Sequence, residues 1–372
     1  MRIASANGFV NTCSTLELVL TSGNVRSSFC DNVFHVDSMR AYRMTGWGEP
    51  PQTTTVPVPA PGPGQILIRV AGCGLCRSDL TMRRIPQSAG TAMGWQMPFT
   101  LGHETAGHVA ALGAGAEGFT VGEAVALVSP TSCGTCDFCV RGRDSDCAAG
   151  LTGRGYGRDG GLASFVLVPG RRDLLRLGDL DPRTAGPLTD AGATAYHAVR
   201  RALPRISPGG TVVVIGAGGL GAFAVQFLRA LTAASVIAVD PLPARRAYAT
   251  SVGAHAAEVS TPRLAADAVL DFAGTDETIT AGVAAVRPGG AYGLIGSAGG
   301  TLRRPWFGNL PRDGEVFTFQ GSTIADAREV IALARAGLIR NEVEEFGFDE
   351  IGTAYERLAG GTLAGRAVVT VD

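Results

Sequence analysis

Four cysteines lie within fifteen residues of this chain, in the stretch CGTCDFCVRGRDSDC, with the spacing C-x2-C-x2-C-x7-C. They are Cys133, Cys136, Cys139 and Cys147. Thiolates held this closely can surround one tetrahedral metal ion without help from distant parts of the fold, and zinc is the metal that we expect. Such a site leaves no coordination position open, so it stabilises a loop of a larger domain and performs no chemistry itself.

This cysteine cluster has two alternative interpretations. Two local disulfides could use the same thiols, and iron–sulfur sites also begin with C-x2-C-x2-C. The iron–sulfur pattern closes with a shorter gap followed by proline, whereas Cys147 comes after seven residues and is followed by Ala148. We therefore favour a structural zinc ion over both alternatives.

Length and charge narrow the class of protein. At 372 residues the chain exceeds the size at which single cores stop growing, so we expect two domains. The net charge of -1 indicates neither nucleic acid nor an anionic membrane as a partner and favours a small neutral molecule. All 32 basic residues are arginine, which excludes a lysine Schiff base, a lysine general base and a Walker-type lysine.

The N-terminal residues 1–38 show no clear period and no continuous apolar segment of a secretory signal. We predict that they form an unstructured extension and that the first domain begins at Met39, which leaves Cys13 and Cys30 without an assigned role. Eight cysteines in a chain that is not exported indicate metal binding rather than disulfides. The predicted location is the cytoplasm.

The remaining sequence divides into three parts by its pattern of expected strands and helices. Residues 39–190 contain short apolar strands between glycines and prolines, which predicts an irregular β-rich domain. Residues 191–322 alternate strands and helices, which predicts a doubly wound parallel sheet in an α/β fold. Residues 323–372 return to helix and strand that could pack on the first domain. About eight residues separate the strand near Val259 from AVLDF, too few for a crossover helix.

An uncharged run from Thr211 to Leu228, TVVVIGAGGLGAFAVQFL, is long enough to suggest a membrane span. Its glycines have the spacing of a nucleotide turn instead, so we predict a buried strand, a turn and a helix. Gly216 permits the tight turn, Gly218 lets the backbone approach a pyrophosphate, and Gly221 allows close packing of helix and strand.

Asp240 ends the next strand, where a carboxylate can bind an adenosine ribose and repel a 2′-phosphate. NAD is therefore favoured over NADP, and over a glycine-rich turn that binds no ligand.

In this order, the motifs GLCRSDL, LGHETAG, the four-cysteine stretch, PLTDAGATAYHAV, GAGGLG and the GR of AGRAVV resemble the zinc-containing alcohol dehydrogenases of the medium-chain dehydrogenase/reductase superfamily. The resemblance runs from Met39 to Asp372. It implies a GroES-like catalytic domain joined to a Rossmann domain, with two zinc ions per chain, one catalytic and one structural. It also implies hydride transfer between NAD and a primary or secondary alcohol, bound to zinc as its alkoxide, and a homodimer or homotetramer.

The resemblance further implies a catalytic zinc bound by Cys76, His103 and Asp190, with a fourth position open to water or alcohol. Glu104 is a second candidate carboxylate. Many family members have cysteine where this chain has Asp190. On their spacing alone, Cys73 and Cys76 could form a redox dithiol. The resemblance makes Cys76 a zinc ligand instead, so Cys73 is expected only to pack in the core.

Other roles follow from the same resemblance. Asp79 is expected to orient His103, and Ser78 to contact the substrate oxygen. Thr81 stands where many relatives have a relay histidine, so the proton must leave through water or another group. The residues expected at the cofactor are Thr194, Gly216, Gly218, Gly219, Leu220, Gly221, Asp240, Arg245 and Arg366. Arg77 is a weaker candidate for the phosphates, and Trp95, Phe99, Trp306 and Phe307 are weaker candidates for the substrate cleft.

Two other functions are alternatives to the alcohol dehydrogenase. The first is a zinc-free reductase of the same superfamily that acts on enones or quinones, which should lack Cys76, His103 and the cysteine stretch. The second is a protein that keeps NAD and zinc without turnover, which would have lost the open zinc position.

Overall fold

The computed structural model describes residues 37–129, 131–303, 305–363 and 365–371. The predicted N-terminal extension lies outside the described residues up to residue 36, and so do Cys13 and Cys30. The first described strand begins at Ser38.

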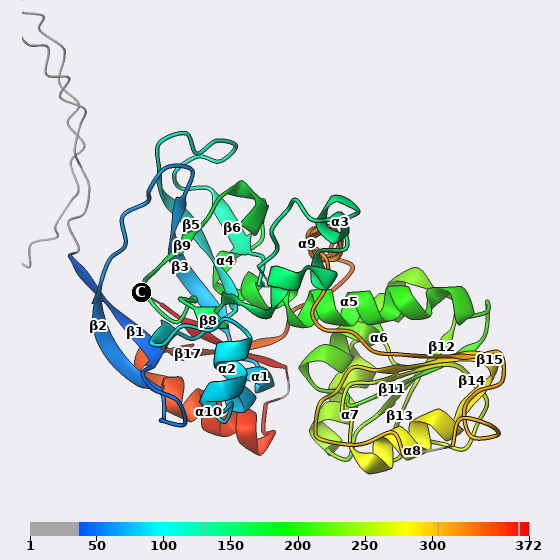
Figure 1. The fold of residues 1–372 in the computed structure, drawn as a ribbon. Helices are drawn as coiled ribbons and strands as arrows, with labels where there is room; N and C mark the ends of the chain where they lie inside the picture. Colours follow the sequence, from blue (N-terminus) through cyan, green and yellow to red (C-terminus); the bar gives the residue numbers. More distant parts are fainter. Residues whose placement is uncertain (1–36, 130, 304, 364, 372) are drawn as a thin grey trace, which may run out of the picture. The chain divides into compact units, whose positions relative to one another are not determined.

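Strands dominate the first part of the described chain (Figure 1). The strands of this part, with the two that return to it from the C-terminus, are β1 (Ser38–Met44), β2 (Gln52–Pro57), β3 (Ile66–Gly74), β4 (Phe99–Thr100), β5 (Glu104–Leu112), β6 (Ala124–Leu127), β7 (Gly153–Arg154), β8 (Gly157–Arg158), β9 (Phe165–Val168), β10 (Leu174–Arg176), β17 (Val343–Gly347) and β18 (Arg366–Thr370). Its helices are α1 (Arg77–Met82), α2 (Gln87–Ala92), α3 (Asp137–Val140) and α4 (Pro182–Ala185).

The main sheet of this part has the order β10-β6-β5-β3-β18-β17, with β9 also paired to β3. Strand β3 is buried along most of its length because its ILIRVAGCG sequence is apolar on both faces. Strand β18 runs antiparallel to β3, with Val368 opposite Gly74 and Thr370 opposite Gly72. The end of the chain therefore completes the sheet that its beginning forms. A smaller sheet has the order β2-β1-β4.

A parallel sheet follows, in the order β13-β12-β11-β14-β15-β16. Its strands are β11 (Thr211–Ile215), β12 (Ser235–Val239), β13 (Ala256–Glu258), β14 (Ala266–Asp271), β15 (Val286–Leu294) and β16 (Glu315–Phe317). The helices of this region are α5 (Ala191–Ala202), α6 (Gly219–Leu231), α7 (Pro243–Ser251), α8 (Asp276–Ala284) and α9 (Ile324–Arg335). Helix α10 (Ile351–Gly360) instead packs on α1, β17 and β18 of the first part. This is the strand order of a doubly wound dinucleotide fold, in which ligands bind where the order reverses, here between β11 and β14.

The two faces of the parallel sheet follow from the alternation of side chains along each strand. In β11, Val212 and Val214 belong to the core cluster that α5 and α6 cover, whereas Val213 and Ile215 belong to the cluster that includes Val283 of α8. Figure 1 shows α5 and α6 on one face and α8 on the other. Residues 259–265, between β13 and β14, contain no helix, as their short length predicts.

The uncharged run from Thr211 is β11, a turn and the start of α6, as predicted. Within the described residues, no helix is long and apolar enough to cross a membrane.

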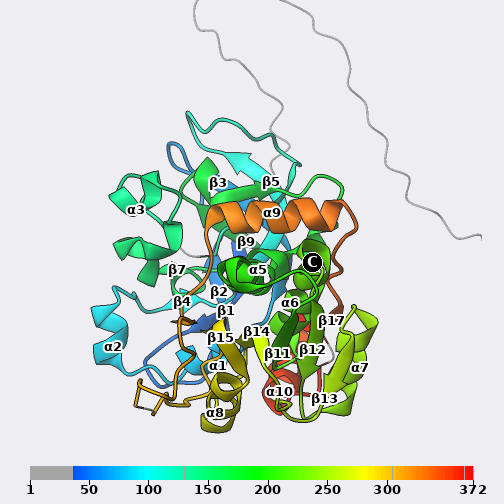
Figure 2. The same ribbon diagram turned by 90° about the vertical axis from the view of Figure 1, so that its right-hand side faces the viewer.

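A cluster of charged side chains joins α5 to α9, and α9 lies across α5 in Figure 2. The Asp326 side chain, only 1% exposed, lies 2.8 Å from His197 Nδ1 and 3.0 Å from Arg200 Nη1. Its Oδ2 also accepts hydrogen bonds from the backbone and the hydroxyl of Thr323, the N-cap residue of α9. Burial alone would raise the pKa of Asp326, but the hydrogen bonds from His197 and Thr323 outweigh burial and lower it to about 2.

Asparagine in place of Asp326 is expected to lower the free energy of unfolding at pH 7 by about 2 kcal/mol, because the carboxylate pKa falls from its ordinary 3.8 to about 2 on folding. A lowered pKa stabilises the fold above its ordinary value, so the difference between variant and wild type should shrink as the pH falls from 5 towards 2. Urea denaturation at several pH values measures it. Asp349, paired with Arg40 at the surface, supplies the control Asp349→Asn, which should change stability little. A difference that does not vary with pH would contradict this assignment.

Candidate functional site

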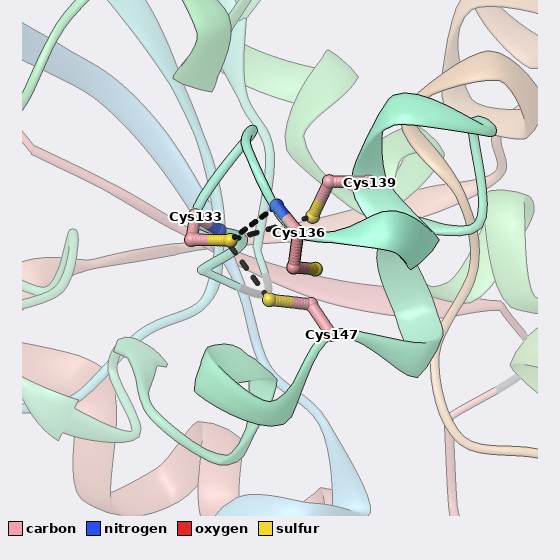
Figure 3. A group of neighbouring side chains, drawn as sticks. All are labelled: Cys133, Cys136, Cys139 and Cys147. Carbon is pink, nitrogen blue, oxygen red and sulfur yellow. Dashed lines mark hydrogen bonds between the residues drawn. The ribbon is translucent and has the colours of Figure 1, made fainter.

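The four cysteines of the spaced stretch converge on one point (Figure 3). One sulfur atom from each lies within 4.8 Å of the others. The Sγ atoms of Cys133 and Cys139 are 3.9 Å apart, whereas a disulfide would need about 2 Å. Four sulfurs placed about 2.3 Å from one zinc ion would lie roughly 3.8 Å apart. The six cysteines of the described region all carry free thiols, so the two-disulfide alternative is not what forms here.

Backbone N–H groups turn toward the sulfur atoms of this cluster. Cys136 N donates to Cys133 Sγ at 3.3 Å, and Cys133 N donates to Cys147 Sγ at 3.4 Å. Hydrogen bonds from the backbone of Thr135 and Cys136 lower the pKa of the Cys133 thiol to about 6, while burial raises that of Cys139 to about 11. N–H donors to sulfur favour the thiolate form that a metal needs.

The cysteine lobe, residues 133–147, is tied to the rest of the chain through Asp144. The carboxylate of Asp144 forms an ion pair with Arg172, and its second oxygen accepts a hydrogen bond from Ile324 N, at the start of α9, at 3.2 Å. The lobe therefore supports the N-terminus of α9.

A second set of donors is formed by Cys76, His103, Glu104 and Asp190, each with a ligand atom within 4.8 Å of the others. Cys76 is the N-cap of α1, Glu104 begins β5 with His103 directly before it, and Asp190 is the N-cap of α5. Three separate turns thus bring together a thiol, an imidazole and two carboxyls, which are all zinc ligands. Glu104 Oε2 is buried without a hydrogen-bond partner among the described residues. A buried carboxylate oxygen left unpaired beside these donors fits a cation at their centre.

The two ring nitrogens of His103 face different partners. Nδ1 lies 3.2 Å from Asp79 Oδ1, while Nε2 lies 3.5 Å from Asp190 Oδ2 and 3.4 Å from Ser78 Oγ. Asp79 is fully buried, and its other oxygen accepts hydrogen bonds from Cys76 N and the Tyr355 hydroxyl, at 3.0 and 3.1 Å. One carboxylate therefore holds both the histidine ring and the backbone of Cys76, with Nε2 directed at the donor set.

The charges of the donor set depend on one another. Burial acts to lower the pKa of His103, but Tyr156, Asp79 and Asp190 raise it well above its usual value. Burial acts to raise the pKa of Asp190, but the hydrogen bond and the charge of His103 outweigh burial and hold that pKa below its ordinary value. For Glu104, burial prevails over the attraction of Arg366 and raises the pKa to about 7.

Arg366 links this donor set to the glycine turn. Its guanidinium forms an ion pair with Glu104 and donates to Leu75 O at 2.9 Å. A Cβ added at Gly219 would collide with the Arg366 side chain. The arginine expected at the pyrophosphate therefore lies against the turn, with its charge directed at Glu104.

The glycine turn has the predicted strand–turn–helix form. Gly216 adopts a φ of +84°, α6 begins at Gly219, and a Cβ at Gly221 would collide with the carbonyl oxygen of Gly216. The backbone N–H groups at the start of α6 can therefore approach an anion closely. Leu220 is partly buried beside the core that α6 covers.

Asp240 lies at the end of β12, beside this turn. Its buried carboxylate accepts hydrogen bonds from Ala217 N at 3.0 Å and Leu242 N at 2.9 Å, and Arg245 Nη1 lies 3.7 Å from it. Arg245 also donates to Gly361 O at 3.1 Å. Thr194 lies on the first turn of α5, and its N–H donates to Asp190 O at 2.7 Å. Turn, acid and arginine thus lie together, while Thr194 is bonded to the backbone of Asp190 in the first turn of α5.

Tyr156 belongs to this site and was not predicted from the sequence. Its hydroxyl lies 3.2 Å from Ser78 Oγ, and its ring centroid lies 4.4 Å from that of His103. The available signal was a lone aromatic residue between two glycines, Gly155 and Gly157, both with positive φ. A Cβ at Gly155 would lie 2.7 Å from the backbone of Gly102, which precedes His103, so the glycine lets this loop reach the histidine.

The weaker candidates occupy other environments. Cys73 is buried in the core, where burial raises its pKa to about 12, which fits packing rather than redox chemistry. Trp95 and Phe99 are buried and pack edge to face. Trp306 and Phe307 pack on each other but are 74% and 78% exposed. These four aromatics do not form one group, and Arg77 is exposed.

Comparison with known proteins gives matches along most of the chain. Residues 62–179 match the family model of the alcohol dehydrogenase GroES-like domain, and residues 219–336 match that of the zinc-binding dehydrogenases. An NAD-dependent alcohol dehydrogenase of Sulfolobus acidocaldarius is 32% identical over 90% of this chain and 100% of its own length. A D-arabinose 1-dehydrogenase (NADP(+)) of Saccharolobus solfataricus is 30% identical over 91% of this chain and 99% of its own. The crystal structure of an alcohol dehydrogenase from Aeropyrum pernix has a TM-score of 0.81 and 30% identity, covering 89% of this chain and 100% of its own.

Proposed function

Because this chain belongs to the zinc-containing alcohol dehydrogenases of the medium-chain dehydrogenase/reductase superfamily, we propose that Cys76, His103 and Asp190 hold a catalytic zinc ion. We further propose that the enzyme interconverts a primary or secondary alcohol and its aldehyde or ketone with NAD. The observation that carries the proposal is the convergence of thiol, imidazole and carboxyl donors from three separate turns. The cysteine lobe would hold a second, structural zinc ion.

Asp190 is the better third ligand, because Glu104 forms a close ion pair with Arg366, whereas Arg366 attracts Asp190 without forming one among the described residues. A bound zinc ion would supply a Lewis acid that lowers the pKa of a hydroxyl, and a bound nicotinamide would accept the hydride. The chain's own residues prepare the site: Asp79 fixes the ring of His103, and Ser78 Oγ is placed to hold the hydroxyl proton of the substrate.

NAD is the proposed cofactor because the Asp240 carboxylate is fixed at the glycine turn, where it would repel a 2′-phosphate. One relative carries NADP(+) in its name, so both cofactors belong in the assay. The proposal also includes a dimer or tetramer and a cytoplasmic location, which rest on the family resemblance and on the metal-type spacing of the cysteines.

Thr81 stands where many relatives have a relay histidine, so another group must carry the proton away from the substrate. The Tyr156 hydroxyl, next to Ser78, can take this role. Phenylalanine in its place is expected to lower kcat about fivefold, because one hydrogen bond to Ser78 is worth roughly 1 kcal/mol. The KM for NAD and the zinc content should not change, since the ring against His103 is kept. Steady-state kinetics with metal analysis measure all three. A fall in zinc content together with kcat would show that Tyr156 only supports the metal site.

The proposed function is tested by following NADH and NADPH formation from purified protein with a panel of alkyl, aryl and polyhydroxy alcohols. Oxidation of an alcohol with a preference for NAD supports it. Reduction of quinones or enones, with no alcohol oxidised, would favour the reductase alternative. Binding of NADH without turnover of any substrate would favour the non-catalytic alternative.

A further inference from the structure

Two arginines lie side by side on the short loop that carries Tyr156. Strands β7 and β8 pair in parallel, with Gly153 opposite Gly157 and Arg154 opposite Arg158. Side chains in register on paired strands project to the same face. Like charges placed directly opposite each other repel, so this pairing is unfavourable unless something negative lies between them.

Neither guanidinium has a hydrogen bond or an ion pair with any residue that the structure describes. Arg158 is exposed, but Arg154 is half-buried, and burial lowers its pKa against the opposing attraction of Asp173. The nearby acid Asp159 also attracts Arg154, but its hydrogen bonds go to other residues. Its Oδ1 accepts hydrogen bonds from Thr100 N at 2.7 Å, Thr100 Oγ1 at 2.9 Å and Arg43 Nη2 at 3.1 Å. The two arginines thus keep their donors available.

Both arginines line a cavity of about 240 Å³, together with Gln96, Phe99 and Asp159. This volume can hold a carboxylate or phosphate group with the atoms next to it. Guanidinium groups bind such oxyanions through paired N–H···O bonds, and the amide of Gln96 is a further donor.

We propose that Arg154 and Arg158 form a binding site for an oxyanion, a carboxylate or a phosphate, next to the active site. The proximity is set by the loop itself, because Tyr156, midway between the arginines, contacts Ser78 and His103. The anion is either a free ion or the far end of the alcohol substrate. The second source rests on the proposed function, whereas the site itself does not.

The site is tested by titrating the zinc-loaded full chain with inorganic phosphate in a calorimeter, with sodium chloride keeping the ionic strength constant. The wild type should show saturable binding. The double variant Arg154→Gln/Arg158→Gln should bind about tenfold more weakly or worse, because it loses charge-assisted hydrogen bonds. The control Arg335→Gln removes an exposed arginine paired with Asp179 and should bind like the wild type.

Absence of saturable phosphate binding by the wild type would overturn the proposal without any variant. A double variant with the wild-type affinity would also overturn it, because phosphate would then be bound elsewhere, for example at the glycine turn. If the double variant fails to fold, the single variant Arg158→Gln answers the question, since that side chain is exposed.

The source of the anion is tested with matched alcohols, 4-hydroxybutanoate against 4-hydroxybutanamide and a longer pair of the same kind. If the anion is part of the substrate, the wild type should prefer the carboxylate in kcat/KM, and the double variant should lose that preference about tenfold. If phosphate binding is lost but the preference does not change, the ligand is a free anion. If no alcohol is turned over, the proposed function fails while the phosphate titration still decides the site.

Discussion

Serine in place of Cys76 is expected to remove one of two zinc ions per chain and to lower kcat/KM for alcohol oxidation about 10³-fold or more. Cys76 is the only thiol in a donor set whose other members are an imidazole and two carboxyls, among the residues that the structure describes. A catalytic zinc contributes several kcal/mol of charge stabilisation, and each 1.36 kcal/mol is tenfold in rate. Elemental analysis and steady-state kinetics on the same preparation measure the effect.

Cys73 provides a matched control, three residues earlier in the same segment. Its Sγ is buried 3.5 Å from the Thr105 hydroxyl and is not a member of either donor set. The variant Cys73→Ser should keep two zinc ions and most of the activity, even where it loses some stability. Equal losses of zinc in both variants would indicate that this segment tolerates no change, and the ligand assignment of Cys76 would lose its support.

Serine in place of Cys139 is expected to remove the other zinc ion and to lower Tm by about 5 °C or more, because loss of a buried structural ligand costs several kcal/mol. The lobe supports the start of α9 through Asp144, so the loss should spread beyond residues 133–147. Activity well below Tm should fall less than tenfold, since the lobe lies outside the second donor set. Thermal unfolding followed by circular dichroism, with metal analysis, measures these effects.

The lobe also supplies the control for this second prediction. Arg143 is exposed and forms an ion pair of 2.5 Å with Asp146 inside the lobe. The variant Arg143→Gln should retain both zinc ions and the wild-type Tm within a degree or two, because exposed ion pairs contribute little. A Cys139→Ser protein that still holds two zinc ions would show that the lobe is not a metal site.

Local patterns in the sequence account for much of the fold. The cysteine spacing placed four thiols around one point because all four lie in one short segment. The run from Thr211 gave the strand, turn and helix of the dinucleotide fold, since a tight turn and a close helix contact both need glycine there. The short link after β13 correctly excluded a crossover helix. Each of these features is decided within about twenty residues.

The contacts that sequence reasoning missed depend on tertiary packing and on strand register. Arg366 pairs with Glu104 because β18 and β5 both flank β3, with Val368 and Glu104 on opposite sides of Gly74. Tyr156 reaches Ser78 because Gly155 and Gly157 bend their loop toward Gly102. Arg154 and Arg158 look like two unrelated surface arginines in the sequence and become neighbours only through the register of two very short strands. No periodicity or motif in the sequence predicts these contacts, because they depend on how the strands pair.

The catalytic zinc site is tested by zinc content, measured beside NADH formation in the wild type and in Asp190→Ala. We expect two zinc ions per chain and alcohol-dependent NADH formation in the wild type, and one zinc ion with turnover lost in Asp190→Ala. One zinc ion and no turnover in the wild type would contradict it, because only the cysteine lobe would then bind metal and the donor set of Cys76, His103 and Asp190 would not be a catalytic centre.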